Sequence, residues 1–155
     1  MLASEIWAKT NTLVRNFGSL KEQEGLEMIN YAIGYMNDFL IGIGDKGMTK
    51  TLAVATGQLV PYDWSGKYAG QFPVTDEAGI FIVTKPFSST STIKYFARKP
   101  MINSMSDTIQ FDDHTAIILP LIASICAINR AEGDTANDER ILQNRLEQLK
   151  AARGA

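Results

Sequence analysis

The sequence predicts a protein of the α+β class, a four-helix bundle with a β-rich insert between its second and third helices. Two observations favour this class. Apolar residues recur every three or four positions in residues 1–47 and again in 112–155, which indicates helices. Residues 48–111 instead hold threonine and β-branched residues in short runs broken by glycine and proline, which is typical of strands. We expect a single domain, residues 1–155, in which the insert forms a small antiparallel sheet or a sandwich.

Two helices are predicted before the insert. The first begins at Ser4, as its cap, and reaches Phe17 with one apolar face. Residues 19–22 have the capping-box spacing that opens a second, longer helix, and the glycines at 42, 44 and 47 end it. The apolar stripe of this second helix steps by three and four through Leu26, Ile29, Ile33, Met36 and Leu40.

Within the insert, strands are predicted at residues 49–56, 59–62, 80–85 and 91–98, with a weaker strand at 108–111. Asp76 and Glu77 form an acidic pair in a turn-like context. Residues 62–70 are rich in turn residues and aromatics, so we expect an exposed loop there. The aromatic residues of this loop include Trp64 and Tyr68.

The two helices after the insert differ in character. Asp112 or Asp113 caps the third, which contains Pro120 and is expected to be kinked and central. Its apolar residues 117–128, including the single cysteine Cys126, should be buried on every side, and they are fewer than the ~20 that span a bilayer. Asp134 caps the fourth helix, which has one apolar face and a charged one. The basic end of this helix should be free to meet a neighbouring protein, through Arg145, Lys150 and Arg153.

The residues that could carry catalytic chemistry are better explained by structural roles. Residues 42–47 (GIGDKG) match the dinucleotide-binding glycine pattern, but that pattern needs a strand before it, and here a helix comes first. His114 beside Asp112 and Asp113 has no second histidine to complete a metal site, so capping is favoured. We therefore predict no enzyme, no catalytic residue, no cofactor and no metal.

Composition is ordinary for a globular domain, with 45% hydrophobic residues and a formal net charge of −2. This charge argues against a nucleic-acid binder, which usually has a basic face. One cysteine builds no disulfide framework, so a reducing compartment fits. The N-terminus lacks the basic start and apolar run of a signal peptide, and we expect no association with membranes.

Several features, taken in order, resemble the head-to-tail adaptor (connector) proteins of tailed bacteriophages. The second helix carries an Asn-x-Ala step at residues 30–32, and a threonine-rich insert follows that ends in an aromatic strand closed by residues 98–100 (RKP). A buried helix rich in alanine and isoleucine comes next, then residues 132–134 (EGD) and a final helix with Leu142, Leu146 and Leu149. The order and spacing of these elements carry the resemblance, which covers most of the chain.

The resemblance implies a structural virion protein, made in the host cytoplasm and located in the neck between portal and tail. It implies a ring of about twelve copies, formed by head-to-tail contacts that close on themselves. The partners would be the portal protein and a tail or nozzle protein, with genomic DNA passing through the channel without specific binding. The exposed aromatics Trp64 and Tyr68 would be candidate anchors of the protein interfaces, because aromatic side chains dominate such contacts. Three other interpretations stay open: another neck component such as a stopper or tail terminator, a glycan-binding module, or a small enzyme with a pocket around Asp112, Asp113 and His114.

Overall fold

A computed structural model describes residues 1–14, 21–54, 61–65, 74–77, 80–83 and 91–153. The chain forms two compact units, a helical unit of Met1–Phe39 with Lys99–Ala155 and a β unit of Leu40–Arg98. The predicted α+β class is confirmed, because helices and small antiparallel sheets occupy separate parts of the chain. The β unit is shorter than the predicted insert at its C-terminal side, since residues 99–111 belong with the helices.

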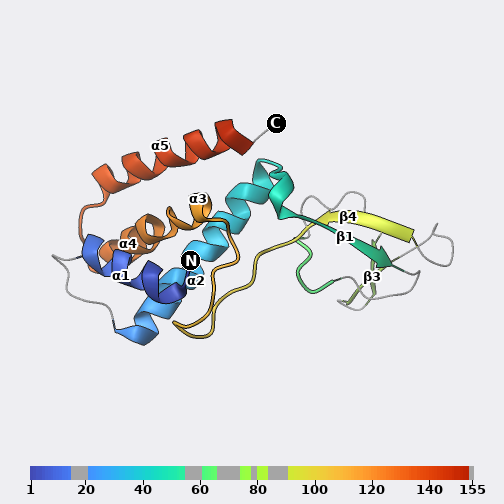
Figure 1. Ribbon diagram of the computed structural model, residues 1–155, viewed down its shortest axis with the longest axis horizontal. Coiled ribbons are helices and arrows are strands. Elements are labelled where there is room, and N and C mark those ends of the chain that lie inside the picture. The colour runs from blue at the N-terminus through green and yellow to red at the C-terminus, as the bar shows by residue number, and fades with distance from the viewer. Residues whose placement is uncertain (15–20, 55–60, 66–73, 78–79, 84–90, 154–155) are drawn as a thin grey trace. The chain divides into compact units, whose positions relative to one another are not determined.

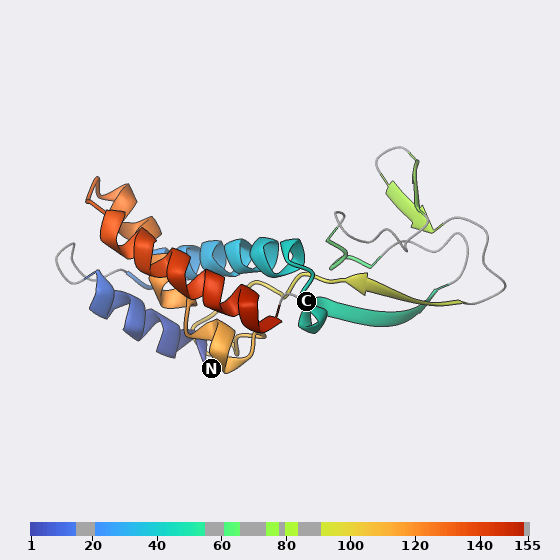
Figure 2. The same ribbon diagram turned by 90° about the horizontal axis from the view of Figure 1, so that it is seen from above.

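The core of the helical unit lies around one helix, α4, which contacts α1, α3 and α5 (Figures 1 and 2). Residues 118–125 are all buried, which confirms for this stretch the prediction of a helix enclosed on every side. Met28, Ile29, Ile33 and Met36 add the buried face of α2. The helices have the bounds α1 Ala3–Leu13, α2 Glu22–Gly42, α3 Asp113–Ala116, α4 Leu119–Arg130 and α5 Ala136–Arg153, and the last residues of α2 belong to the β unit.

The prediction of one kinked helix around Pro120 is wrong. Two turn residues separate α3 from α4, and Pro120 is the second residue of α4. In the first turn of a helix the backbone N–H has no intrahelical acceptor, so the donor that proline lacks is not missed there. Asp112 caps α3 as predicted, with its carboxylate accepting from the Thr115 N–H at 2.9 Å. The break between the helices leaves Ile117 48% exposed, so its predicted burial is also wrong.

Two asparagines on α2 hold residues 99–102 along that helix. The Asn37 side-chain amide donates to the Lys99 carbonyl at 3.0 Å and accepts from the Lys99 N–H at 2.8 Å. Asn30 makes the same pair of bonds with the backbone of Ile102, at 3.0 and 2.8 Å. Seven residues are two helical turns, so both amides lie on one face of α2. The sequence pattern around Asn30 does not predict these bonds to Ile102.

The β unit contains two separate two-stranded antiparallel sheets, β1 with β4 and β2 with β3. The strands are β1 Thr49–Val54, β2 Val74–Glu77, β3 Ile80–Val83 and β4 Ser91–Phe96, and Thr49 pairs with Phe96 at one end of the first sheet. Strand predictions at 49–56, 80–85 and 91–98 are confirmed over most of their described residues. β2 was missed, because Asp76 and Glu77 suggested a turn.

Two predicted strands are not formed where the structure describes them. Pro61 and Tyr62 precede and begin a turn, so the strand at 59–62 is wrong in its described part. Of residues 108–111, only Thr108 makes a bridge, to Leu2, so that strand is wrong as well.

The start of α1 differs from the prediction, whereas the turn after α2 and the start of α5 agree with it. α1 begins at Ala3, and the Glu5 carboxylate accepts from the Leu2 N–H at 2.8 Å, so Ser4 is not the cap. Residues 15–20, which hold the rest of the predicted first helix and most of the capping box, lie outside the described residues. After α2, Gly44 adopts a φ of 73° and a short 3-10 helix, η2 (Lys46–Met48), leads into β1, which confirms a turn in residues 42–47. Asp134 accepts from the Ala136 N–H at 3.0 Å at the start of α5.

Candidate interaction surfaces

Three exposed apolar side chains meet in one groove of the helical unit. Leu13, Ile117 and Ile141 are 47%, 48% and 37% exposed, and all three line a groove of about 430 Å³ between α1, the start of α4 and α5. We call it the α1–α5 groove. Its other lining residues are Lys9, Thr12, Pro120, Leu121, Asp138 and Arg145. Large apolar side chains that gather at one exposed place mark a surface for another protein.

Local structure explains why these side chains are exposed. Leu13 is the last residue of α1. Ile117 lies in the two-residue turn before α4, which exists because the chain starts a new helix at Leu119. Ile141 precedes the buried Leu142 on α5, so it lies at the edge of the apolar face of that helix. The groove therefore combines apolar side chains from the end of α1, from the break between α3 and α4, and from the edge of the apolar face of α5.

Charged side chains at the edge of the groove are mainly basic. Lys9 from α1 and Arg145 from α5 are both exposed, and Asp138 is the one carboxylate among its lining residues. An apolar floor with a charged edge is the usual composition of a protein interface, where the centre is desolvated and the rim stays wet. Arg145 is thus a predicted interface residue that the structure places beside exposed apolar surface.

A second hollow, of about 730 Å³, lies between α3 and α5 and shares Ile117 and Arg145 with the groove. The Arg153 guanidinium lies at one side of it and pairs with the Asp112 carboxylate, with nitrogen–oxygen distances of 2.6 and 2.7 Å. This pairing lowers the pKa of Asp112 to about 2, with the Arg153 hydrogen bond as the main cause. The prediction that Arg153 is free to meet a neighbour is wrong, because its side chain is only 20% exposed and holds the cap of α3.

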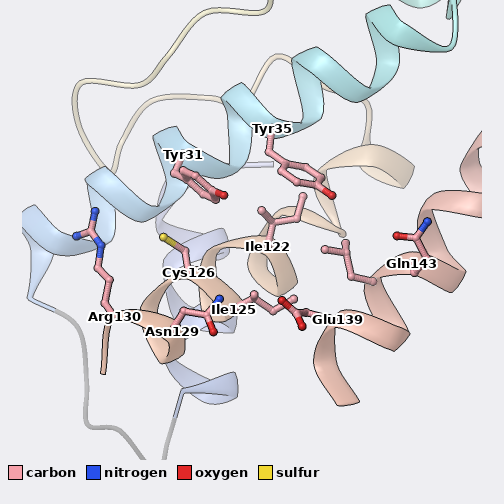
Figure 3. Close-up of a pocket in the computed structure, with 10 residues that line it drawn as sticks. Tyr31, Tyr35, Ile122, Ile125, Cys126, Asn129, Arg130, Glu139 and Gln143 are labelled. Carbon is pink, nitrogen blue, oxygen red and sulfur yellow. The ribbon is translucent and has the colours of Figure 1, made fainter. Parts of the chain in front are cut away.

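A third hollow, of about 590 Å³, lies between α2, α4 and α5 and has an aromatic wall. In Figure 3, Tyr31 and Tyr35 extend from α2 over Ile122 and Cys126 of α4. Glu139 and Gln143 of α5 face them across the opening. Cys126 is half-buried in this hollow, whereas full burial was predicted.

Asp63 of the β unit is a buried carboxylate that is 8% exposed. It accepts from the Lys50 ammonium at 2.6 Å and from the Tyr95 hydroxyl at 2.9 Å. Its backbone carbonyl accepts from the Arg98 N–H at 2.8 Å. Burial, helped by the bond to Asp63, raises the pKa of Tyr95 to about 12, and the same carboxylate raises the pKa of Lys50. Residues 61–65 are thereby fixed to the β1–β4 sheet.

This fixed turn presents one aromatic side chain and covers another. Tyr62 is 97% exposed. Trp64, the predicted exposed anchor, is instead half-buried, since its backbone bridges to Ala97 beside β4. The prediction of Trp64 as an exposed anchor is therefore wrong, and Tyr62 is the exposed aromatic of this turn. Tyr68, the second predicted anchor, lies outside the described residues.

The other candidate residues from the sequence lie on α5 or at the start of α3. Lys150 is exposed on α5, three residues before the end of that helix at Arg153. His114 is exposed, and Asp113 beside it lies 3.7 Å from the N-terminal ammonium of Met1. Across the described residues, no group of three or more His, Cys, Asp and Glu side chains converges in the way that a metal ion requires. Asp112, Asp113 and His114 start a helix, which fits the capping interpretation.

Sequence reasoning found Arg145 but missed its apolar neighbours. Leu13, Ile117 and Ile141 were each assigned to an apolar face or segment that should be buried. The only signal that distinguishes them is position: one ends a helix, one precedes the proline turn, and one lies at the edge of an apolar stripe.

Comparison with known proteins gave no match: no family model, curated protein or solved structure is similar to this chain. Among the helices that the structure describes, none has the length and apolar character needed to cross a bilayer.

Proposed function

We propose that this chain is a structural virion protein, a head-to-tail adaptor of a tailed bacteriophage. About twelve copies form a ring in the neck of the particle, joined to the portal on one side and to a tail or nozzle protein on the other. The four long helical segments act as one bundle, and the β unit is a separate compact unit of the same chain. Genomic DNA passes through the ring without specific binding, and a formal net charge of −2 per chain suits a surface along which DNA slides.

The α1–α5 groove is the observation that supports this proposal best. A ring subunit needs exposed surface that another protein covers, and Leu13, Ile117 and Ile141 supply it together with the basic edge of Lys9 and Arg145. The helices that line the groove, α1 and α5, both pack against the buried helix α4, so the groove has a defined shape. The order of elements along the chain, which resembles the adaptor proteins, indicates which kind of assembly this is.

Electron microscopy of negatively stained particles tests the proposal. Purified portal rings are imaged alone and after addition of this protein, and we expect an added ring of density on one end of the portal. A variant with Ile141→Asp, which places a charge in the groove, should add no ring. A Tyr62→Ala variant is not altered in the groove and serves as a control for portal attachment through the helical unit. If the protein stays a monomer that never binds portal or tail protein, the proposal is wrong.

A second candidate function rests on Tyr62. An aromatic side chain that is 97% exposed on a turn fixed by Asp63 is also the type of platform on which a sugar ring stacks. A glycan-binding module would bind an oligosaccharide with the Tyr62→Ala variant losing binding, and it would form no ring. The original protein and the Tyr62→Ala variant are each titrated with a panel of glycans. Binding that only the original protein shows would favour the glycan-binding function over the adaptor function.

A further inference from the structure

We propose that the α1–α5 groove of one copy receives the exposed face of α2 of a second copy. This contact rests on the proposed ring function, because it names the two surfaces through which neighbouring copies meet. It is heterologous, meaning that the two copies contribute different surfaces, and such a contact closes into a ring or grows into a chain.

The face of α2 that would enter the groove is a stripe of five exposed residues. We call it the α2 stripe: Glu24, Glu27, Tyr31, Tyr35 and Asp38. Steps of three and four residues place all five on one side of the helix. Tyr31 is 53% exposed and Tyr35 is 37% exposed, and Figure 3 shows both rings on the α4 side of α2. Tyrosine is among the residues that most often anchor a protein contact.

Charge makes the stripe and the groove complementary. The stripe carries three carboxylates around its two tyrosines, whereas the groove has Lys9 and Arg145 around its apolar side chains with one carboxylate, Asp138. Arg130 lies 3.5 Å from Glu27, but both side chains are more than half exposed, so this pairing is weak and easily exchanged. Opposite charges across a contact fix its register and speed encounter.

The two surfaces also account for most of the exposed apolar area of the helical unit. Among its described residues, the large exposed hydrophobic side chains are Leu2, Leu13, Tyr31, Tyr35, Met101, Ile117 and Ile141. Three of them lie in the groove and two in the stripe. A second copy covers both sets with one repeated contact, whereas a contact of the groove with another groove would bring like charges together and leave the tyrosines exposed.

Mixing two variants tests the contact. Leu13→Glu puts a negative charge in the groove and leaves the stripe intact, and Tyr31→Ala removes an aromatic anchor from the stripe and leaves the groove intact. Each variant alone should associate at least about tenfold more weakly than the original protein, because it disrupts an anchor position. Mixed in equal amounts, they should form a one-to-one dimer that grows no further, since only one intact groove can meet one intact stripe. Native mass spectrometry measures all three samples.

Tyr62→Glu is the matched control, because Tyr62 is exposed and aromatic but belongs to neither surface; it should associate as the original protein does. The inference is overturned if both groove and stripe variants still assemble, or if the original chain stays monomeric at about 100 µM, well above the Kd of a micromolar contact. It is also overturned if the mixture gives no dimer. In each case portal binding by the original protein still decides the proposed function separately.

Discussion

In the helical unit, α4 is enclosed by apolar side chains, whereas in the β unit Lys50 of β1 and Tyr95 of β4 bond to the buried carboxylate of Asp63. The first arrangement gains stability from contact area, which is non-directional and tolerates exchange between residues of similar volume. The second depends on a few bonds with defined geometry, and the loss of any one leaves a buried polar group without its partner. The helical unit is therefore suited to carry docking surfaces, and the β unit to hold one turn in a fixed conformation.

The two tryptophans of the chain make this comparison measurable. Trp7 lies in α1 of the helical unit, and Trp64 lies beside Asp63 in the β unit. Variants that keep only one of them report by fluorescence on one unit at a time during unfolding in urea. The predictions below run from the largest expected effect to the smallest.

Leu119→Ala removes a fully buried side chain from the first turn of α4 and should lower the free energy of unfolding of the helical unit by about 2–5 kcal/mol. Urea unfolding followed through Trp7 measures the change. Leu13→Ala, at a position that is 47% exposed, is the control and should change stability by less than about 0.5 kcal/mol. Equal losses in the two variants would contradict the placement of the core around α4.

Asn37→Ala tests a polar contact inside the apolar unit. The Asn37 side chain is fully buried, and its removal leaves the N–H and the carbonyl of Lys99 without their partner, at a cost of about 2–4 kcal/mol. The measurement is again unfolding followed through Trp7. Asn144→Ala, at an exposed position of α5, should change stability by less than about 0.5 kcal/mol. A harmless Asn37→Ala would mean that residues 99–102 are held by other contacts.

Tyr95 gives the β unit a dependence on alkaline pH. Its pKa in the folded protein is about 12, against an ordinary value of 10.0, so the folded state keeps the phenol proton after the unfolded state has lost it. The stabilisation is complete below pH 10 and is lost as the pH rises to about 12, by about 3 kcal/mol at most. Lys50 adds a loss in the same direction, since its pKa is also raised. Urea unfolding followed through Trp64 should show the decline, and Tyr95→Phe should show less of it; an identical decline would refute the role of the phenol.

Arg153→Ala should have the smallest effect, below about 1 kcal/mol, because the Asp112 carboxylate that it pairs with is half exposed. The pKa of Asp112 is lowered to about 2, so this pairing stabilises the protein at neutral pH and is lost as the pH falls below about 4 towards 2. Thermal unfolding of the original and variant proteins should therefore differ at pH 7 and converge near pH 2. Lys150→Ala is the control with no expected dependence. Divergence at low pH would contradict the assignment.

Elements with a strong period and clear ends were predictable from the sequence. The apolar stripe of α2 and the glycines after it predict this helix and its C-terminal end. The leucines of α5 and the cap Asp134 predict the last helix and its start. Strands β1 and β4 followed from their β-branched residues, although β2 did not, because Asp76 and Glu77 favour turns. Pro120 was placed in the wrong turn of its helix, since the sequence alone does not distinguish an interior proline from one that starts a new helix.

The candidate surfaces were harder to predict, because exposure depends on contacts between distant residues. The sequence predicts a free Arg153 at the end of α5, but this side chain pairs with Asp112, which lies 41 positions away in the chain. The sequence predicts an exposed Trp64, but its turn forms a bridge to Ala97, in which the Arg98 N–H donates to the Asp63 carbonyl. Leu13, Ile117 and Ile141 looked buried, and only the assembled helices show that they share one groove.

The mass of the complex formed with portal tests the central claim most directly. Native mass spectrometry of portal rings saturated with this protein should show the addition of a fixed number of chains, about twelve, as a closed ring requires. Portal rings mixed with the Leu13→Glu variant should not gain this fixed number of chains. Addition of a variable number of chains, or of none, would contradict the account of this protein as a ring-forming adaptor.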